Sequence, residues 1–181
     1  MQKEADSVSI PINRLGFRIL NLNGSMVAEE TIMICIDTSQ WTSSCLNRYS
    51  YELQFKCIQS YCRAKLESSN PTYAVAIATM GTLHREWVND TSDLDKVLRH
   101  LELNVIVDGK FNFIGALTSS MMKLRFYIPS ERKRMLFFIG GPTNLDVVKA
   151  KAYGETLKRR GVALDVVNFC LLEKKDAGYT C

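Results

Sequence analysis

The most constraining feature of this sequence is an unbroken apolar run that ends abruptly in polar residues. Ile32–Ile36 contains no polar side chain, and Asp37–Ser39 follows it directly. A short apolar run with polar boundaries indicates a strand buried on both faces, as in a parallel sheet. The carboxyl ends of parallel strands form the edge at which open α/β sheets meet ligands and partners. We therefore expect the polar residues that follow this strand to lie at a functional edge.

Hydrophobic periodicity along the rest of the chain predicts strands that alternate with amphipathic helices. The second and third strands are joined by a tight connection, which predicts that they pair antiparallel at one edge of the sheet. The fold class that follows is α/β: a Rossmann-like, doubly wound, mostly parallel sheet with one antiparallel edge strand and helices on both faces. The predicted strands are residues 32–36, 73–80, 84–88, 135–139 and 162–169, and the predicted helices are residues 48–66, 91–101, 113–127 and 144–160.

The composition is that of a globular domain. Hydrophobic residues make up 46% of the 181 residues and charged residues 23%, and the net charge of +4 is only mildly basic. No apolar run approaches the ~18 residues of a membrane span. The six cysteines include no Cys-x-x-Cys pair, and Cys35 lies inside the predicted central strand. We interpret them as free thiols of a reducing compartment, and their spacing relative to His84 and His100 does not suit zinc.

Three loops should converge at the carboxyl edge of the predicted sheet: residues 37–47, 108–113 and 140–144. The first loop resembles the start of the metal-ion-dependent adhesion site of von Willebrand factor A domains, which reads Asp-x-Ser-x-Ser. Asp37 and Ser39 match the first two of these positions. The fold that this resemblance implies is the α/β sheet predicted above.

The remaining metal-ligand positions of that family are replaced here. Trp41 stands where the second serine is expected, Phe111 stands at the threonine of the second loop, and Gly140–Pro142 carries no aspartate. Magnesium prefers a near-octahedral shell of oxygens, usually with carboxylates, and aromatic rings supply none. We therefore expect a degenerate site without metal or other cofactor. Asp37 is expected either to cap neighbouring backbone amides or, as an exposed acid, to meet a basic residue of a partner.

Four motifs together resemble one branch of the von Willebrand A family, in the same order and at similar spacing. They are Ile34–Trp41, Ser69–Pro71, Thr91–Leu94 and Val162–Phe169. The branch is that of the proteasome regulatory-particle non-ATPase ubiquitin-receptor subunits, also described as multiubiquitin-chain-binding proteins. The resemblance implies a non-catalytic domain that docks on the regulatory particle and stabilises lid–base association in ubiquitin-dependent protein degradation. It also implies a cytoplasmic and nuclear location, with no membrane or nucleic-acid partner.

The same resemblance implies where partners bind. The aspartate that matches Asp37 belongs to the docking surface of that branch, and we place Ser39, Gln40, Trp41 and Asn112 on the same partner-binding edge. The expected partners are lid and base subunits of the regulatory particle, with no catalytic residue among the five. Reversing the charge of Asp37 should then weaken docking without unfolding the domain.

The ends of the chain differ from that branch. We expect an N-terminal extension over residues 1–29, the von Willebrand A domain over residues 30–169 and a short tail over residues 170–181. Members of the branch continue into short ubiquitin-interacting helices with an acidic start, and the tail has no such pattern. We therefore expect this chain to meet ubiquitin chains only indirectly.

Three other functions are open to this sequence. A scaffold subunit of a transcription or DNA-repair complex is the main alternative, supported by the basic residues 132–134 and 158–160, although basic residues are favourable near helix ends in any protein. A metal-dependent adhesion domain is the second. An enzyme is the third, but the dinucleotide, phosphate-loop and nucleophile-elbow motifs are all missing from the sequence.

Overall fold

The computed structural model describes residues 28–40, 42, 48–67, 73–81, 86–103, 109–126, 130–141 and 146–169. Most of the predicted N-terminal extension, the whole predicted tail, Trp41 and His84 lie outside these residues. In chain order the elements are β1 (Ala28–Ile36), α1 (Arg48–Leu66), β2 (Tyr73–Thr79), β3 (Glu86–Thr91), α2 (Leu94–Leu103), α3 (Phe113–Phe126), β4 (Ser130–Ile139), α4 (Val147–Arg159) and β5 (Val162–Asn168).

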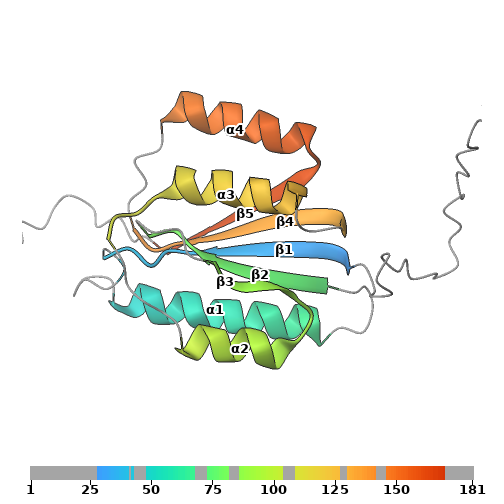
Figure 1. Ribbon diagram of the computed structural model, residues 1–181. Coiled ribbons are helices and arrows are strands. Elements are labelled where there is room, and N and C mark those ends of the chain that lie inside the picture. The colour runs from blue at the N-terminus through green and yellow to red at the C-terminus, as the bar shows by residue number, and fades with distance from the viewer. Residues whose placement is uncertain are drawn as a thin grey trace, which may run out of the picture.

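The described strands form one sheet in the order β3-β2-β1-β4-β5. Strand β1 pairs parallel with β2 and with β4, and β4 pairs parallel with β5. Strand β3 runs antiparallel to β2 at the edge, as the tight connection predicted. Helices α1 and α2 cover one face of the sheet, and α3 and α4 lie on the other side (Figure 1). The predicted fold class is confirmed.

The central position of β1 explains its unbroken apolar run. Side chains of a strand alternate between the two faces of a sheet. Ile32, Ile34 and Ile36 pack in the core beneath α1 and α2, while Met33 and Cys35 pack in the core beneath α3. All five are at most 1% exposed. None of these five positions meets solvent, so an apolar side chain is favoured at each of them.

Two helices begin at acidic residues that cap them. The Asp93 carboxylate accepts a hydrogen bond of 3.1 Å from the backbone N–H of Lys96, so α2 begins at Leu94, three residues into the predicted segment 91–101. Asp146 caps α4 by accepting from the N–H of Val148 at 2.9 Å, which places the start of that helix three residues after the predicted one. Such caps satisfy amides that have no partner within the helix. At the other end of α4, Gly161 adopts a φ of 63°, the left-handed conformation expected of a glycine that follows a helix.

The structure corrects two details of the predicted elements. Strand β4 begins at Ser130 rather than at residue 135, because its charged residues pair with acidic side chains of β1 and β5. The loose helical spacing of Leu145, Val148, Ala152 and Leu157 predicts that Val148 lies on the buried side of α4, but it is 77% exposed. The C-terminal half of α4 makes the contact with the core, through the buried side chain of Leu157 and the partly buried Tyr153.

Three cysteines in the described ranges, Cys35, Cys57 and Cys62, are free thiols as predicted. Cys35 and Cys62 are buried, and burial raises the pKa of each to about 12. The Cys35 sulfur also lies 3.1 Å from the Ser120 hydroxyl oxygen. These two thiols therefore pack as small apolar side chains. Within the described residues, no helix combines the length and apolar character that crossing a membrane requires.

Candidate functional site

Asp37 immediately follows β1 and is completely buried. One carboxylate oxygen accepts a hydrogen bond from the backbone N–H of Ser39 at 2.9 Å. The other oxygen accepts from the N–H groups of Gly140 at 3.0 Å and Gly141 at 2.9 Å. The carboxylate thus joins the loop after β1 to the loop after β4, as the capping alternative predicted. The expectation of an exposed acid is wrong.

The strand register explains why this carboxylate meets those glycines. Strands β1 and β4 pair up to Ile36 and Phe138, and the N–H of Asp37 continues the ladder with a hydrogen bond of 3.0 Å to the Phe138 carbonyl. The chain after β4 then turns past the end of β1 with two consecutive amides directed at the Asp37 side chain. Hydrogen bonds to an ionised acceptor are stronger than bonds between neutral groups, so this contact holds the two loops together.

The three predicted loops do converge at this edge. The N–H of Gln40 donates to the Gly109 carbonyl at 2.9 Å, which connects the first loop to the second. The N–H of Met80, at the end of β2, donates to the Ile36 carbonyl at 2.8 Å, and the N–H of Asn112 donates to the Met80 carbonyl at 2.8 Å. Backbone hydrogen bonds therefore fix the described parts of the loops after β1, after β2 and before α3 relative to one another.

The predicted partner-binding residues divide into an interior and a surface group. Asp37 and Ser39 are buried, at 0% and 1% exposure. Gln40 and Asn112 are exposed, and the Asn112 side chain also accepts a hydrogen bond of 2.9 Å from the N–H of Gly115 in the first turn of α3. Trp41 lies outside the described residues. A partner that meets this edge directly would contact the surface group, while the interior group maintains its shape.

The residues present do not fit the metal ion that the adhesion-site motif implies. Both Asp37 oxygens are directed at amide hydrogens, which repel a cation at the same positions. Phe111 is partly buried and packs toward the core, with its ring centre 6.3 Å from that of Phe113, so it offers no oxygen where the motif has a threonine. The Ser39 hydroxyl is buried without a hydrogen-bond partner among the described residues, but one hydroxyl is far from an octahedral shell.

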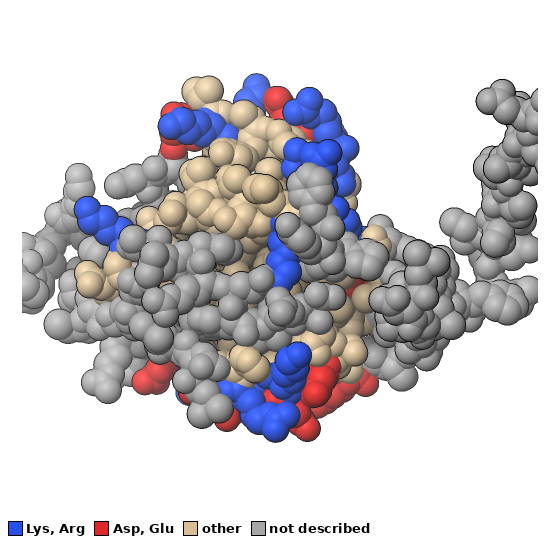
Figure 2. All heavy atoms as spheres, in the orientation of Figure 1, with Lys and Arg blue, Asp and Glu red and all other residues tan. Residues whose placement is uncertain are grey.

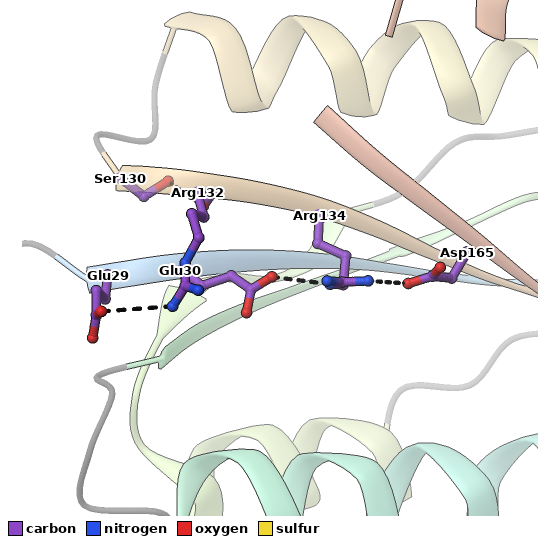
Figure 3. A network of polar contacts seen from close by, with 6 residues as sticks. All are labelled: Glu29, Glu30, Ser130, Arg132, Arg134 and Asp165. Atoms are coloured by element: carbon purple, nitrogen blue, oxygen red, sulfur yellow. Dashed lines mark hydrogen bonds and ion pairs between the residues drawn. The ribbon is translucent and has the colours of Figure 1, made fainter. Parts of the chain in front are cut away.

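A polar cluster at the other end of β1 was not found by sequence reasoning. Glu30, only 6% exposed, accepts a hydrogen bond of 2.9 Å from Nε of Arg134 on β4, and Nη1 of the same guanidinium donates to Asp165 on β5 (Figure 3). These two bonds raise the pKa of Arg134 above its ordinary value. Beside them, Arg132 forms a longer ion pair of 3.6 Å with Glu29.

The sequence carried a signal for this cluster. Acidic residues open β1, and basic residues occupy the positions of β4 that pair with them: Glu30 is opposite Arg132, and Ile32 is opposite Arg134. The basic run was interpreted as a stretch between elements or at a helix end. The structure places it within a strand, where the opposite charges of the neighbouring strands stabilise it.

The fold and the loops at the carboxyl edge of the sheet together define the class of protein. The structure superposes on the crystal structure of the SpRpn10 VWA domain with a TM-score of 0.68, at 22% sequence identity, over 78% of this chain and 75% of that chain. The fold is therefore that of a von Willebrand A domain, here with the ligand positions of its adhesion site replaced.

Within this class, the sequence is similar to those of one kind of subunit. The chain is 34% identical over 149 residues to the 26S proteasome non-ATPase regulatory subunit 4 homolog of Arabidopsis thaliana and 34% identical over 149 residues to that of Oryza sativa subsp. japonica. Each match covers 80% of this chain but only 37% and 36% of the respective relative, so the chain spans little more than a third of their length. No family model matches the chain. The domain is thus similar in sequence to the proteins named as 26S proteasome non-ATPase regulatory subunit 4 homologs, which confirms the resemblance drawn from its motifs.

Proposed function

We propose that this chain is a non-catalytic subunit of a proteasome regulatory particle, which it joins through its von Willebrand A domain to stabilise the association of lid and base. The observation that carries this proposal is the 34% identity to proteins named as proteasome regulatory subunits, over 80% of the chain. A scaffold in a transcription or DNA-repair complex is not carried forward, because these relatives are proteasome subunits. The cytoplasm and the nucleus are the compartments expected for this role.

The geometry of the carboxyl edge supports docking rather than chemistry. The acidic side chain that joins these loops, Asp37, is buried and accepts three backbone amides, so it offers no oxygen to a substrate or a metal. Around it the loops present the exposed polar residues Gln40, Lys110 and Asn112. A rigid rim of polar side chains on hydrogen-bonded loops suits a protein interface, because little conformational entropy is lost on binding.

Asp37 and Ser39 keep a role in this proposal, but an indirect one. Their contacts hold the loop that carries Gln40 against the loops that carry Lys110 and the glycines after β4. Trp41 stays a proposed contact because it follows Gln40 directly in the sequence. The interface would thus comprise Gln40, Trp41, Asn112 and the neighbouring exposed Lys110, with the two buried residues positioning them.

Recovery of tagged variants in proteasomes purified from the native source tests this function. The double variant Gln40→Arg, Lys110→Glu changes only exposed side chains, and we expect at least about fivefold lower recovery, since a polar rim contact contributes about 1 kcal/mol. Its thermal unfolding midpoint should match that of the wild type. Lys151→Glu, at an exposed position on α4 away from this edge, is the matched control and should be recovered normally.

Two results would contradict the proposal. If neither the wild type nor the control co-purifies with proteasome subunits, the chain is not a subunit. If the double variant is recovered as well as the wild type, the carboxyl edge is not the docking surface, even if the chain is a subunit.

A further inference from the structure

A hollow of about 320 Å³ lies at the opposite end of the sheet from Asp37. Lys133 and Val162 are paired residues at the beginning of β4 and β5, and Met121 and Arg125 come from the last turns of α3. Arg160 follows directly after α4. The lining residues are Met121, Arg125, Lys133, Arg160 and Val162.

The charged residues that line this hollow all have the same sign. Three of these five lining residues are cationic and none is acidic. Met121 is 8% exposed and Val162 is partly buried, so the cations surround an apolar floor. In Figure 2 the Lys and Arg atoms gather along the flank that lies over the C-terminal ends of α3 and α4 in Figure 1. Like charges around one small space repel each other, and a bound anion relieves that repulsion.

Backbone hydrogen bonds hold the charged group of Lys133 and the main chain of Arg160. The Lys133 ammonium donates a hydrogen bond to the Leu124 carbonyl in the last turn of α3, which uses one of its three donor hydrogens. The N–H of Arg160 donates to the Leu157 carbonyl at 3.0 Å and so fixes the point where this side chain leaves the end of α4. Charges positioned in advance lose less entropy when a ligand binds.

The ends of helices alone do not account for this arrangement. Cations near a helix C-terminus are stabilising in any protein, which explains basic residues after α3 and α4 separately. Lys133, however, comes from a strand, and the three cations converge on one hollow with an apolar floor. This combination matches a ligand with both negative charge and aliphatic surface.

We propose that this hollow binds an acidic peptide segment of a partner protein, in which carboxylate side chains flank an aliphatic residue. The carboxylates would pair with Arg125, Lys133 and Arg160, and the aliphatic side chain would contact Met121 and Val162. A nucleic acid is less suited, because the described lining residues include no aromatic ring for base stacking and the net charge of the chain is only +4. The proposal does not depend on docking at the carboxyl edge or on the identity of the partner complex.

Fluorescence anisotropy with the full chain tests this site. The probe is a fluorescein-labelled hexapeptide that reads Glu-Glu-Leu-Glu-Glu-Leu, and the reference is the same peptide with Gln in place of Glu. We expect the acidic peptide to bind and the Gln peptide not to. The variant Arg160→Glu should weaken binding at least about tenfold, as expected for a charge pair whose sign is reversed.

Arg159→Glu is the matched control, because it makes the same charge change one residue away. Arg159 does not line the hollow, and its guanidinium lies 3.3 Å from the Thr156 hydroxyl. It should weaken binding less than about twofold, through the long-range field alone. Arg125→Gln is a second variant of the hollow in case Arg160→Glu does not fold.

Several outcomes would overturn the proposal. Equal losses in Arg159→Glu and Arg160→Glu would show attraction to overall charge rather than to this hollow. Full competition by millimolar inorganic phosphate would show a site for small anions. Tighter binding of a 20-base-pair DNA duplex than of the peptide would show a nucleic-acid surface instead.

Discussion

Glu30 and Asp37 lie at opposite ends of β1, and each is a carboxylate that folding has buried. Asp37 is surrounded by neutral donors, the backbone amides of Ser39, Gly140 and Gly141. Glu30 instead meets a full charge, the guanidinium of Arg134. The same functional group is thus stabilised by loop backbone at one end of the strand and by a neighbouring strand's side chain at the other.

The two arrangements differ in which polar groups lose their partner when one side chain is substituted. Removing Asp37 leaves three amides without an acceptor in the interior. Removing Arg134 leaves two carboxylates, Glu30 and Asp165, without their cation near a partly open side of the sheet, where the Arg134 side chain itself is 33% exposed and that of Asp165 is 51% exposed. Water can relieve the second loss but not the first, so we expect the carboxyl edge to be the more sensitive end of β1.

The largest expected effects are therefore those of substitutions at Asp37, and Asp37→Ala gives a loss of stability that can be measured. A buried donor without an acceptor costs about 1–3 kcal/mol, so the loss of three should lower the free energy of unfolding by about 3–5 kcal/mol. Urea denaturation followed by circular dichroism measures this. Asp37→Asn keeps one acceptor oxygen and should cost about half as much. A loss below about 1 kcal/mol for the alanine variant would show that the loops are held by other contacts.

Asp37→Arg is a second test of the burial of the Asp37 side chain. An exposed Asp37 would allow this variant to remain folded, which is what the sequence alone predicts. With the side chain completely buried, a cation facing three amide hydrogens should prevent folding. Soluble expression and the far-ultraviolet circular dichroism spectrum decide this, and a stably folded variant would mean that the loops can open.

The next effect in size is that of Arg134→Met, which leaves Glu30 buried without its cation. Breaking a buried pair costs about 3–5 kcal/mol, and partial exposure of Arg134 reduces this to about 2 kcal/mol. The double variant Glu30→Gln, Arg134→Met removes the uncompensated charge, so it should be more stable than Arg134→Met alone. Chemical denaturation of the wild type, Arg134→Met, Glu30→Gln and the double variant completes the cycle. Equal stability of the single and double variants would indicate that Glu30 is hydrated after all.

A smaller effect is expected for Asp165→Asn, the outer member of the same cluster. Its side chain is half exposed, and exposed ion pairs contribute about 0–1 kcal/mol. The loss should therefore be below about 1 kcal/mol and should shrink further in 0.5 M salt, where exposed charges are screened. A loss as large as that of Arg134→Met would mean that the exposed pair matters as much as the buried one.

The smallest effect concerns Tyr61 of α1, whose ring lies near the Glu30–Arg134 end of β1. Burial raises the pKa of its hydroxyl to about 12. Between pH 10 and 12 the unfolded chain therefore loses this proton before the folded chain does, and the free energy of unfolding falls as the pH rises. Tyr61→Phe should show a smaller fall between pH 9 and pH 11 than the wild type. Identical pH profiles would mean that the hydroxyl is solvated in the folded state.

Local sequence predicted the helices and strands where one signal dominated. The apolar run of β1, the bounds of α1 at Arg48 and Leu66, and the start of α2 after Asp93 could all be read from neighbouring residues. The predictions were less accurate where residues distant in the sequence determine the start of an element or the exposure of a side chain. The beginning of β4 depends on acidic residues of other strands, and the exposure of Val148 depends on which half of α4 reaches the core.

The candidate site likewise has features that could be predicted from the sequence and features that could not. The motif around Asp37 and the aromatic residue at Phe111 sufficed to predict a von Willebrand A edge whose metal ligands are replaced. The burial of Asp37 could not be predicted, because its two glycine partners lie 103 and 104 residues further along the chain. Neither could the basic hollow, whose five described lining residues are spread over α3, β4, the end of α4 and the start of β5.

The sequence by itself determined the order of strands and helices, the class of fold and the resemblance to a proteasome subunit, because apolar periodicity, caps and short motifs act within a few residues of one another. Only the tertiary structure decided which polar groups are buried, which charges pair and where cations converge. Those outcomes depend on the register between strands and on the packing of helices at their ends. Both bring together residues whose positions along the chain are unrelated.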